Sequence, residues 1–86
     1  MPTLAVFYGI VVTMYADDHR YPHFHVRYAE YRASYALGTR SIIVGRVPLR
    51  VARLVEEWAS LHERELKANW DRVRSHQSVQ RIPPLS

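Results

Sequence analysis

Three histidines gather within seven positions, at His19, His23 and His25. Residues 23–28 alternate between polar and apolar side chains, which is typical of a half-buried strand. Side chains two positions apart in a strand point to the same face, so the His23 and His25 imidazoles should project together, roughly 6.5–7 Å apart. Because unperturbed imidazole titrates at about pH 6.5, one ring can act as a base while its neighbour acts as an acid. We therefore take His23 and His25 as candidate catalytic residues, with His19 assisting.

The same residue types also suit a metal ion. Two imidazoles on one face, with His19 or Asp18 as a further ligand, can hold zinc or another divalent ion and leave a position for water. His-x-His on the polar face of a strand also occurs with no chemical role. The pattern is less specific than a full zinc signature, so our primary expectation is a site without a cofactor, with zinc bound by His19, His23, His25 and Asp18 as the alternative.

Arginine dominates the positive charge of the chain. The net charge is +4, from 12 basic and 8 acidic residues, and only Lys67 among the basic residues is a lysine. Guanidinium groups bind phosphate in a bidentate manner, which favours an anionic partner. If residues 29–30 form a two-residue loop, Arg27 lies opposite Arg32, and like charges in that arrangement repel unless an anion lies between them. We expect Arg20, Arg27 and Arg32 to bind phosphate.

The first half of the chain has the composition of an antiparallel sheet. Residues 3–8 and 10–15 are rich in β-branched and aromatic residues, and Gly9 between them indicates a bulge or a sharp bend. Residues 23–28 and 31–37 alternate and should pair, so that Phe24 faces Tyr35 and His25 lies beside Ser34. A short strand follows over 41–44, ended by Gly45 and Arg46.

The second half has a helical period. Pro48 suits the first turn of a helix, and apolar residues that include Trp58 and Trp70 continue along one side as far as residue 73. One long helix or two helices meeting near residues 60–62 both fit. We expect an α+β domain over 1–75, in which an N-terminal antiparallel sheet of four or five short strands (about 3–44) packs against these helices (about 48–75). Residues 76–86 should form a flexible or docked tail. Trp58 and Trp70 belong in the core, or mark a partner surface if they are exposed.

Composition excludes several classes of protein. There are no cysteines, which removes disulfides, thiolate zinc sites and cysteine nucleophiles. No apolar run approaches the roughly 20 residues of a membrane helix, and no secretory signal pattern opens the chain. A cytoplasmic domain without a membrane partner is expected.

Several motifs together resemble a known family. They are Phe7-Tyr8-Gly9-Ile10, Met14-Tyr15, Asp18-His19, Pro22-His23-Phe24-His25, Glu57-Trp58, Leu61-His62, Glu65-Leu66 and Asn69-Trp70. In these motifs the chain is similar, over about residues 1–74, to a small bacterial family catalogued as domain of unknown function 4160. The resemblance implies a gene that lies beside a second small gene, as in type II toxin–antitoxin modules. It carries no catalytic assignment for the matching positions His19, Pro22, His23, Phe24 and His25.

Together these observations favour the toxin of such a pair, an endoribonuclease that cleaves RNA without a metal. Its partner would be a cognate small antitoxin-like protein, and a homo-oligomer is compatible with open sheet edges. A non-catalytic binding module (an antitoxin, a regulator or a protein-partner subunit) and a histidine-based metal-binding protein are the alternatives.

Overall fold

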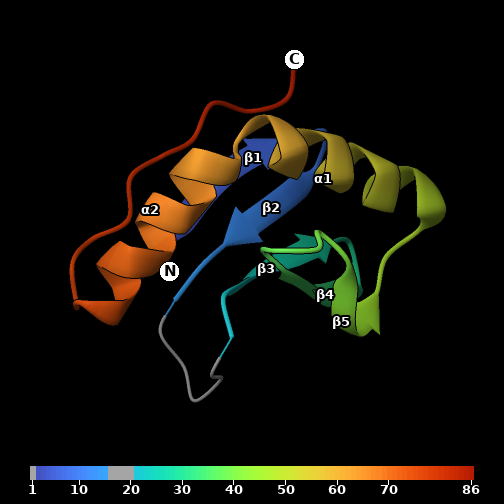
Figure 1. The fold of residues 1–86 in the computed structure, drawn as a ribbon. Helices are drawn as coiled ribbons and strands as arrows, with labels where there is room; N and C mark the ends of the chain where they lie inside the picture. Colours follow the sequence, from blue (N-terminus) through green and yellow to red (C-terminus); the bar gives the residue numbers. More distant parts are fainter. Residues whose placement is uncertain (1, 16–20) are drawn as a thin grey trace.

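A single antiparallel sheet and two consecutive helices make up the computed structural model, which describes residues 2–15 and 21–86 (Figure 1). The strands lie in the order of the sequence, each paired with the next. This arrangement confirms the expected α+β class. The elements are β1 (Thr3–Phe7), β2 (Ile10–Thr13), β3 (His23–Tyr28), β4 (Tyr31–Ala36), β5 (Ile42–Arg46), α1 (Leu49–Leu61) and α2 (Glu63–Arg74).

The hairpin of β3 and β4 forms in the expected register. Phe24 pairs with Tyr35, His25 with Ser34 and Arg27 with Arg32. The loop is the two-residue turn over 29–30, and Ala29 adopts a left-handed φ of 50° there. This register directs Phe24 toward the helices, where its ring meets that of Trp58, and directs His25 and Arg27 toward the opposite face.

The turn between β1 and β2 differs from the expectation. The two strands pair antiparallel from Phe7 and Ile10 outward, so they form a full hairpin and the expected bulge or bend at Gly9 is wrong. Tyr8 and Gly9 have φ values of 51° and 77°, and positive φ at both central residues is the requirement of the favoured two-residue turn. The sequence did not predict this turn, because tyrosine is not a residue type that usually adopts a positive φ at the first central position.

β5 is longer than expected, because it continues through Gly45 to Arg46. Gly45 has a φ of 82°, and a Cβ there would collide with the carbonyl oxygen of Arg32 on β4. Only glycine allows this close approach of the two backbones. The glycine therefore belongs to the strand and does not end it.

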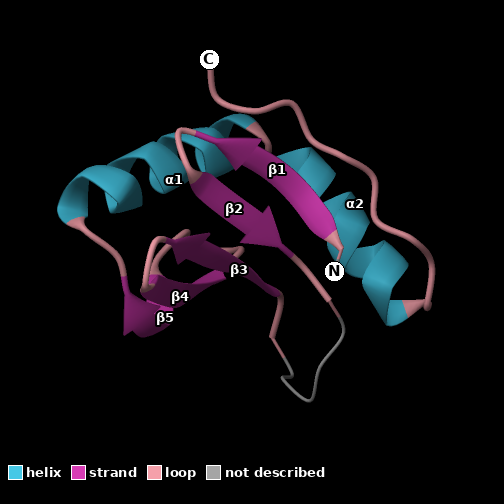
Figure 2. Cartoon of the chain, turned by 180° about the vertical axis from the view of Figure 1, so that it is seen from behind, coloured by secondary structure: helices cyan, strands magenta, loops and turns pink. Residues whose placement is uncertain are grey.

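Both helices cover one face of the sheet (Figure 2). Trp58 of α1 is fully buried, and its ring lies 5.5 Å from the Phe7 ring and 6.1 Å from the Phe24 ring. The helical segment consists of two helices, since His62 has non-helical dihedral angles between α1 and α2. Neither helix in the described chain has the length and apolarity needed to cross a membrane.

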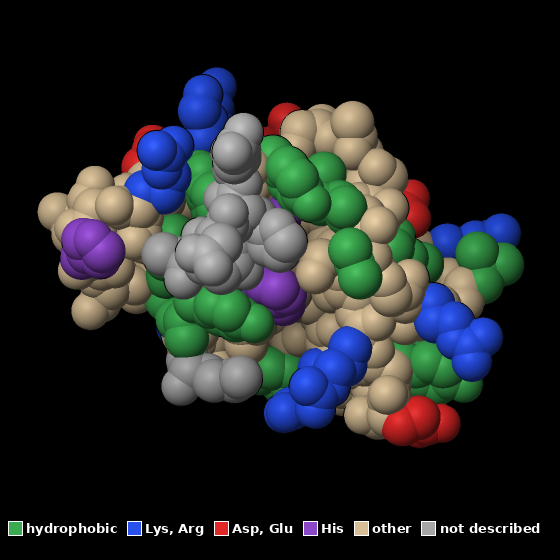
Figure 3. Space-filling view, turned by 90° about the horizontal axis from the view of Figure 1, so that it is seen from below, with side chains coloured by type: hydrophobic (Ala, Val, Ile, Leu, Met, Phe, Trp, Pro, Cys, Tyr) green, Lys and Arg blue, Asp and Glu red, His purple; other side chains and the backbone are tan. Residues whose placement is uncertain are grey.

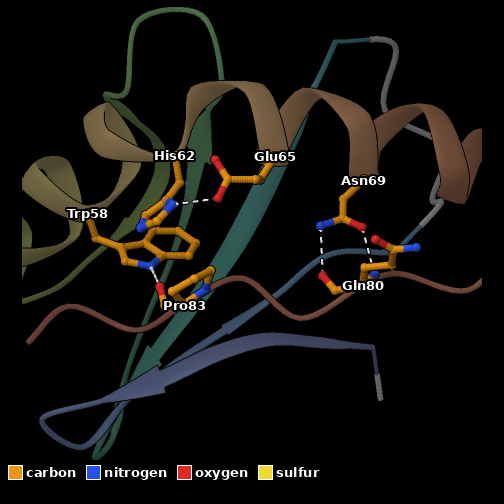
Figure 4. A network of polar contacts seen from close by, with 6 residues as sticks. All are labelled: Trp58, His62, Glu65, Asn69, Gln80 and Pro83. Atoms are coloured by element: carbon orange, nitrogen blue, oxygen red, sulfur yellow. Dashed lines mark hydrogen bonds and ion pairs between the residues drawn. The ribbon is translucent and has the colours of Figure 1, made fainter.

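The C-terminal tail is docked. It runs back along α2 toward β1 (Figure 1), where the Ile82 N–H donates to the Leu4 carbonyl oxygen at 2.9 Å. The Asn69 side chain donates to the Gln80 carbonyl and accepts from the Gln80 N–H, and the Trp58 indole N–H donates to the Pro83 carbonyl (Figure 4). The tail therefore covers the β1 edge and completes the core.

Candidate functional site

The face of the sheet away from the helices contains a hollow of about 540 Å³. All five strands contribute to it, so the coiling of the sheet creates its shape. No acidic side chain is among the described residues that line it. Viewed from below Figure 1, a histidine side chain is visible near the middle of the surface, with basic side chains on two sides (Figure 3). The polar side chains that line the hollow are those of Thr3, Thr13, Tyr15, His25, Arg27, Arg32 and Ser34.

His25 lies in the wall of this hollow and is held by its neighbours. Its ring stacks on the Tyr15 ring, with centroids 4.5 Å apart and planes 4° from parallel. Its Nδ1 lies 3.2 Å from Ser34 Oγ, the residue opposite on β4. In the tautomer that carries its proton on Nε2, Nδ1 accepts from the Ser34 hydroxyl. Nδ1 is therefore directed toward Ser34, which lines the hollow, whereas Nε2 is buried.

His23 has a different environment from the predicted one. Its ring lies beside that of His25, as the strand spacing predicts, although the ring centroids are 5.0 Å apart and so closer than the expected separation. However, His23 is only 1% exposed, and its ring packs 5.2 Å from Trp70 of α2. Its Nδ1 donates to the Tyr21 carbonyl oxygen at 2.9 Å. The expectation of two solvent-facing imidazoles is therefore corrected: His25 reaches the hollow, and His23 supports it from within the core.

The predicted arginine pair is present on the open face. Arg27 and Arg32 are direct cross-strand partners on β3 and β4, both are exposed, and both line the hollow. Arg46 of β5 lies opposite Arg32 in turn, with its guanidinium carbon 5.9 Å from the Tyr31 ring centre. In the described part of the chain, Arg27 and Arg32 have no acidic partner. Three adjacent strands thus bring positive charges into register, and an anion on this face would relieve their repulsion.

The remaining predicted site residues divide into two groups. His19, Asp18 and Arg20 lie outside the described residues. Trp58 and Trp70 are both buried, so their assignment to the core holds and the partner surface predicted for them is corrected. In the described ranges no group of three histidine or acidic residues is close enough to hold a metal ion.

Sequence reasoning missed three polar members of the hollow, Thr3, Thr13 and Tyr15. Thr13 pairs with His25 across β2 and β3, and Tyr15 stacks on the same imidazole. The role of Thr13 and Tyr15 depends on the pairing of β2 with β3, and no local sequence pattern indicates the register of that pairing. Alternation within residues 10–15 could have placed Val11, Thr13 and Tyr15 on one face, but apolar residues filled most of that run and hid the signal.

The fold and the hollow define a small α+β protein with an open, basic sheet face. The family model described as domain of unknown function (DUF4160) matches residues 9–71. The chain belongs to this family. No curated protein and no solved structure matches this chain.

Proposed function

We propose that the protein binds RNA in the hollow of the open sheet face and cleaves it without a metal ion, as the toxin of a cytoplasmic toxin–antitoxin-like pair. The observation that carries the proposal is the exposed cross-strand pair of Arg27 and Arg32 next to His25. A phosphodiester between the guanidinium groups would gain bidentate contacts and relieve their repulsion. The toxin role follows the resemblance of the sequence motifs, with a small antitoxin-like protein as partner.

The chemistry uses the 2′-hydroxyl of RNA as the nucleophile. His25 Nδ1 already lies within hydrogen-bond distance of a hydroxyl, that of Ser34. A 2′-hydroxyl that replaces the Ser34 hydroxyl can pass its proton to Nδ1 as its oxygen attacks the adjacent phosphorus. Arg27 and Arg32 then stabilise the negative charge that develops on the phosphate oxygens. His23 acts as a positioning residue, and the assisting role expected of His19 would be to protonate the leaving 5′-oxygen.

Cleavage of a labelled RNA oligonucleotide tests the catalytic part. We expect His25→Ala to reduce the cleavage rate about 100-fold or more, the scale typical of a lost general base. His76→Ala, in the exposed tail, is the matched control and should cleave like the wild type. A DNA oligonucleotide of the same sequence should not be cleaved, because it lacks the nucleophile. Equal rates for His25→Ala and the wild type would contradict the mechanism.

Binding tests the phosphate contacts separately. We expect Arg27→Gln and Arg32→Gln each to weaken RNA binding and to lower the slope of log affinity against log salt by about 0.7, the contribution of one phosphate contact on a single strand. Arg64→Gln on the exposed side of α2 removes the same charge and should leave the slope unchanged. Fluorescence anisotropy at several salt concentrations gives these slopes. A uniform effect of all three substitutions would indicate net charge instead of a site.

A non-catalytic binding module is the second candidate, and the burial of His23 and of His25 Nε2 favours it. In such a module the histidines shape the wall of the hollow, and the arginines hold an anion without reaction. RNA binding with the expected arginine dependence, but no cleavage by the wild type, would select this function over the toxin.

A further inference from the structure

The two edge strands of the sheet, β1 and β5, have different neighbours in the described chain. At the β1 edge the tail is bound through the Ile82 N–H and the Leu4 carbonyl, and Ile82 is buried. At the other edge, β5 has β4 as its only neighbour in the sheet, and all five of its residues are exposed. Within the described chain, no segment covers this edge. β5 therefore presents backbone groups that another strand can pair with.

The side chains of β5 suit strand pairing. Ile42, Ile43 and Val44 are β-branched and exposed, with Val44 at 60%. Exposed sheet edges commonly carry charged residues or proline, which oppose pairing, and these three positions carry neither. The pairing of β4 with β5 shifts register at Ile43. Such a bulge increases the local twist, so the edge suits one short strand better than a flat stack of many.

The charge around β5 indicates what kind of strand would bind. Residues 21–50 contain five arginines and one glutamate, and among these arginines Arg40 is paired with Glu63 of α2. Arg46 lies within β5, Arg32 lies opposite it on β4, and Arg50 is exposed at the start of α1. An incoming strand with acidic side chains would be attracted to this edge, and one with basic side chains would be repelled.

A second copy of the chain fits this edge poorly. Each copy carries a net charge of +4, and Arg46 places one of the positive charges within β5 itself, so two copies would repel each other at this edge. Pairing of one five-residue strand with its copy would also bury much less than the roughly 1,200 Å² of a stable interface.

We propose that β5 is a docking site for an extended, acidic segment of another protein, which adds to the sheet as a sixth strand. Main-chain hydrogen bonds to β5 would supply affinity, and acidic side chains beside Arg46 and Arg32 would supply specificity. Val44 and Gly45 also line the hollow, so the added strand would stand at its rim. The docking site does not depend on the proposed RNA chemistry.

A synthetic peptide in which valine alternates with glutamate is the probe. Titrated into the full chain and followed by NMR, it should shift and protect from exchange the amides of residues 41–46, and leave those of the helices unchanged. The same peptide with lysine for glutamate should bind about tenfold more weakly or worse, since its ammonium groups would face the arginines of β4 and β5 instead of pairing with them. A peptide with proline at alternate positions should not bind, because it cannot pair.

Two variants of the chain distinguish binding at the β5 edge from a general effect of net charge. Val44→Glu should abolish peptide binding. Leu49→Glu adds the same charge at a residue that is 67% exposed just outside the sheet and should bind like the wild type. Circular dichroism checks that both fold. Equal binding of the glutamate and lysine peptides, binding of the proline peptide, or protection outside residues 41–46 would overturn the proposal. So would dimerisation through β5 in the absence of peptide, measured by sedimentation.

Discussion

At the scale of single residues, Tyr35 is the most unusual polar group of the core. Its side chain is fully buried and stacks on Phe24 at 5.3 Å between centroids. Its hydroxyl has no hydrogen-bond partner in the described part of the structure. Burial raises the pKa of the Tyr35 phenol from 10.0 to about 12, and the negative charge of Glu56 adds to the rise.

The raised pKa predicts a loss of stability in alkaline solution. Between pH 10 and about 12 the unfolded chain releases this proton while the folded chain keeps it, so the free energy of unfolding falls by about 1.4 kcal/mol per pH unit. Tyr35→Phe should remove this slope. It should also raise stability near neutral pH by about 1 kcal/mol, because it removes an unpaired buried hydroxyl. Urea unfolding at several pH values measures both effects.

Tyr8→Phe is the control, because Tyr8 is 56% exposed. It should leave both the slope and the stability at neutral pH as in the wild type. Retention of the alkaline slope in Tyr35→Phe would contradict the assignment of that slope to Tyr35.

The histidines show how far residue patterns reach. Strand alternation correctly predicted that the His23 and His25 rings lie side by side, because that relation depends only on local geometry. It could not predict the burial of His23, since Trp70, a residue of α2 far along the chain, covers it. Local spacing thus defines orientation, whereas exposure depends on the packing of distant elements.

At the scale of secondary structure elements, the pairing of β4 with β5 depends on Gly45. Gly45→Ala should lower the free energy of unfolding by about 2–4 kcal/mol, because it adds left-handed strain and a collision with the Arg32 carbonyl. Gly38→Ala is the matched control: a Cβ there has nothing within 4 Å, so its effect should stay within about 0.5 kcal/mol. Urea denaturation compares the two. Similar losses at both glycines would show that the close approach of β5 to β4 contributes nothing.

The hairpins show which elements the sequence specifies. The alternation of residues 23–28 and 31–37 predicted the β3–β4 register on the condition of a two-residue loop, and the structure has that loop at residues 29–30. The β1–β2 turn was missed, since Tyr8 adopts a positive φ that its residue type does not indicate. The helix break was predicted as one of two alternatives, because the spacing between Leu61 and Leu66 interrupts the apolar stripe without a proline or glycine.

At the scale of the whole molecule, the tail joins the two ends of the chain. Ile82 is buried against the core while its neighbour Arg81 is exposed. Ile82→Ala should lower the free energy of unfolding by about 2–5 kcal/mol, the usual cost of truncating a buried isoleucine, and Arg81→Ala should change it by less than about 0.5 kcal/mol. The fluorescence of the two buried tryptophans reports unfolding. Equal stability of both variants would mean that the tail is not part of the cooperative unit.

The strand order has a consequence for how this molecule assembles. Every strand pairs with its neighbour in the sequence, so the sheet can grow one hairpin at a time, and such local pairing favours rapid folding. Among the described residues, the backbone hydrogen bond between Leu4 and Ile82 joins the first strand to the tail, so this contact must form after the tail has been synthesised. During synthesis the sheet and the helices can therefore form early. The contacts of the tail with β1 and the helices form only after residues 79–83 have left the ribosome.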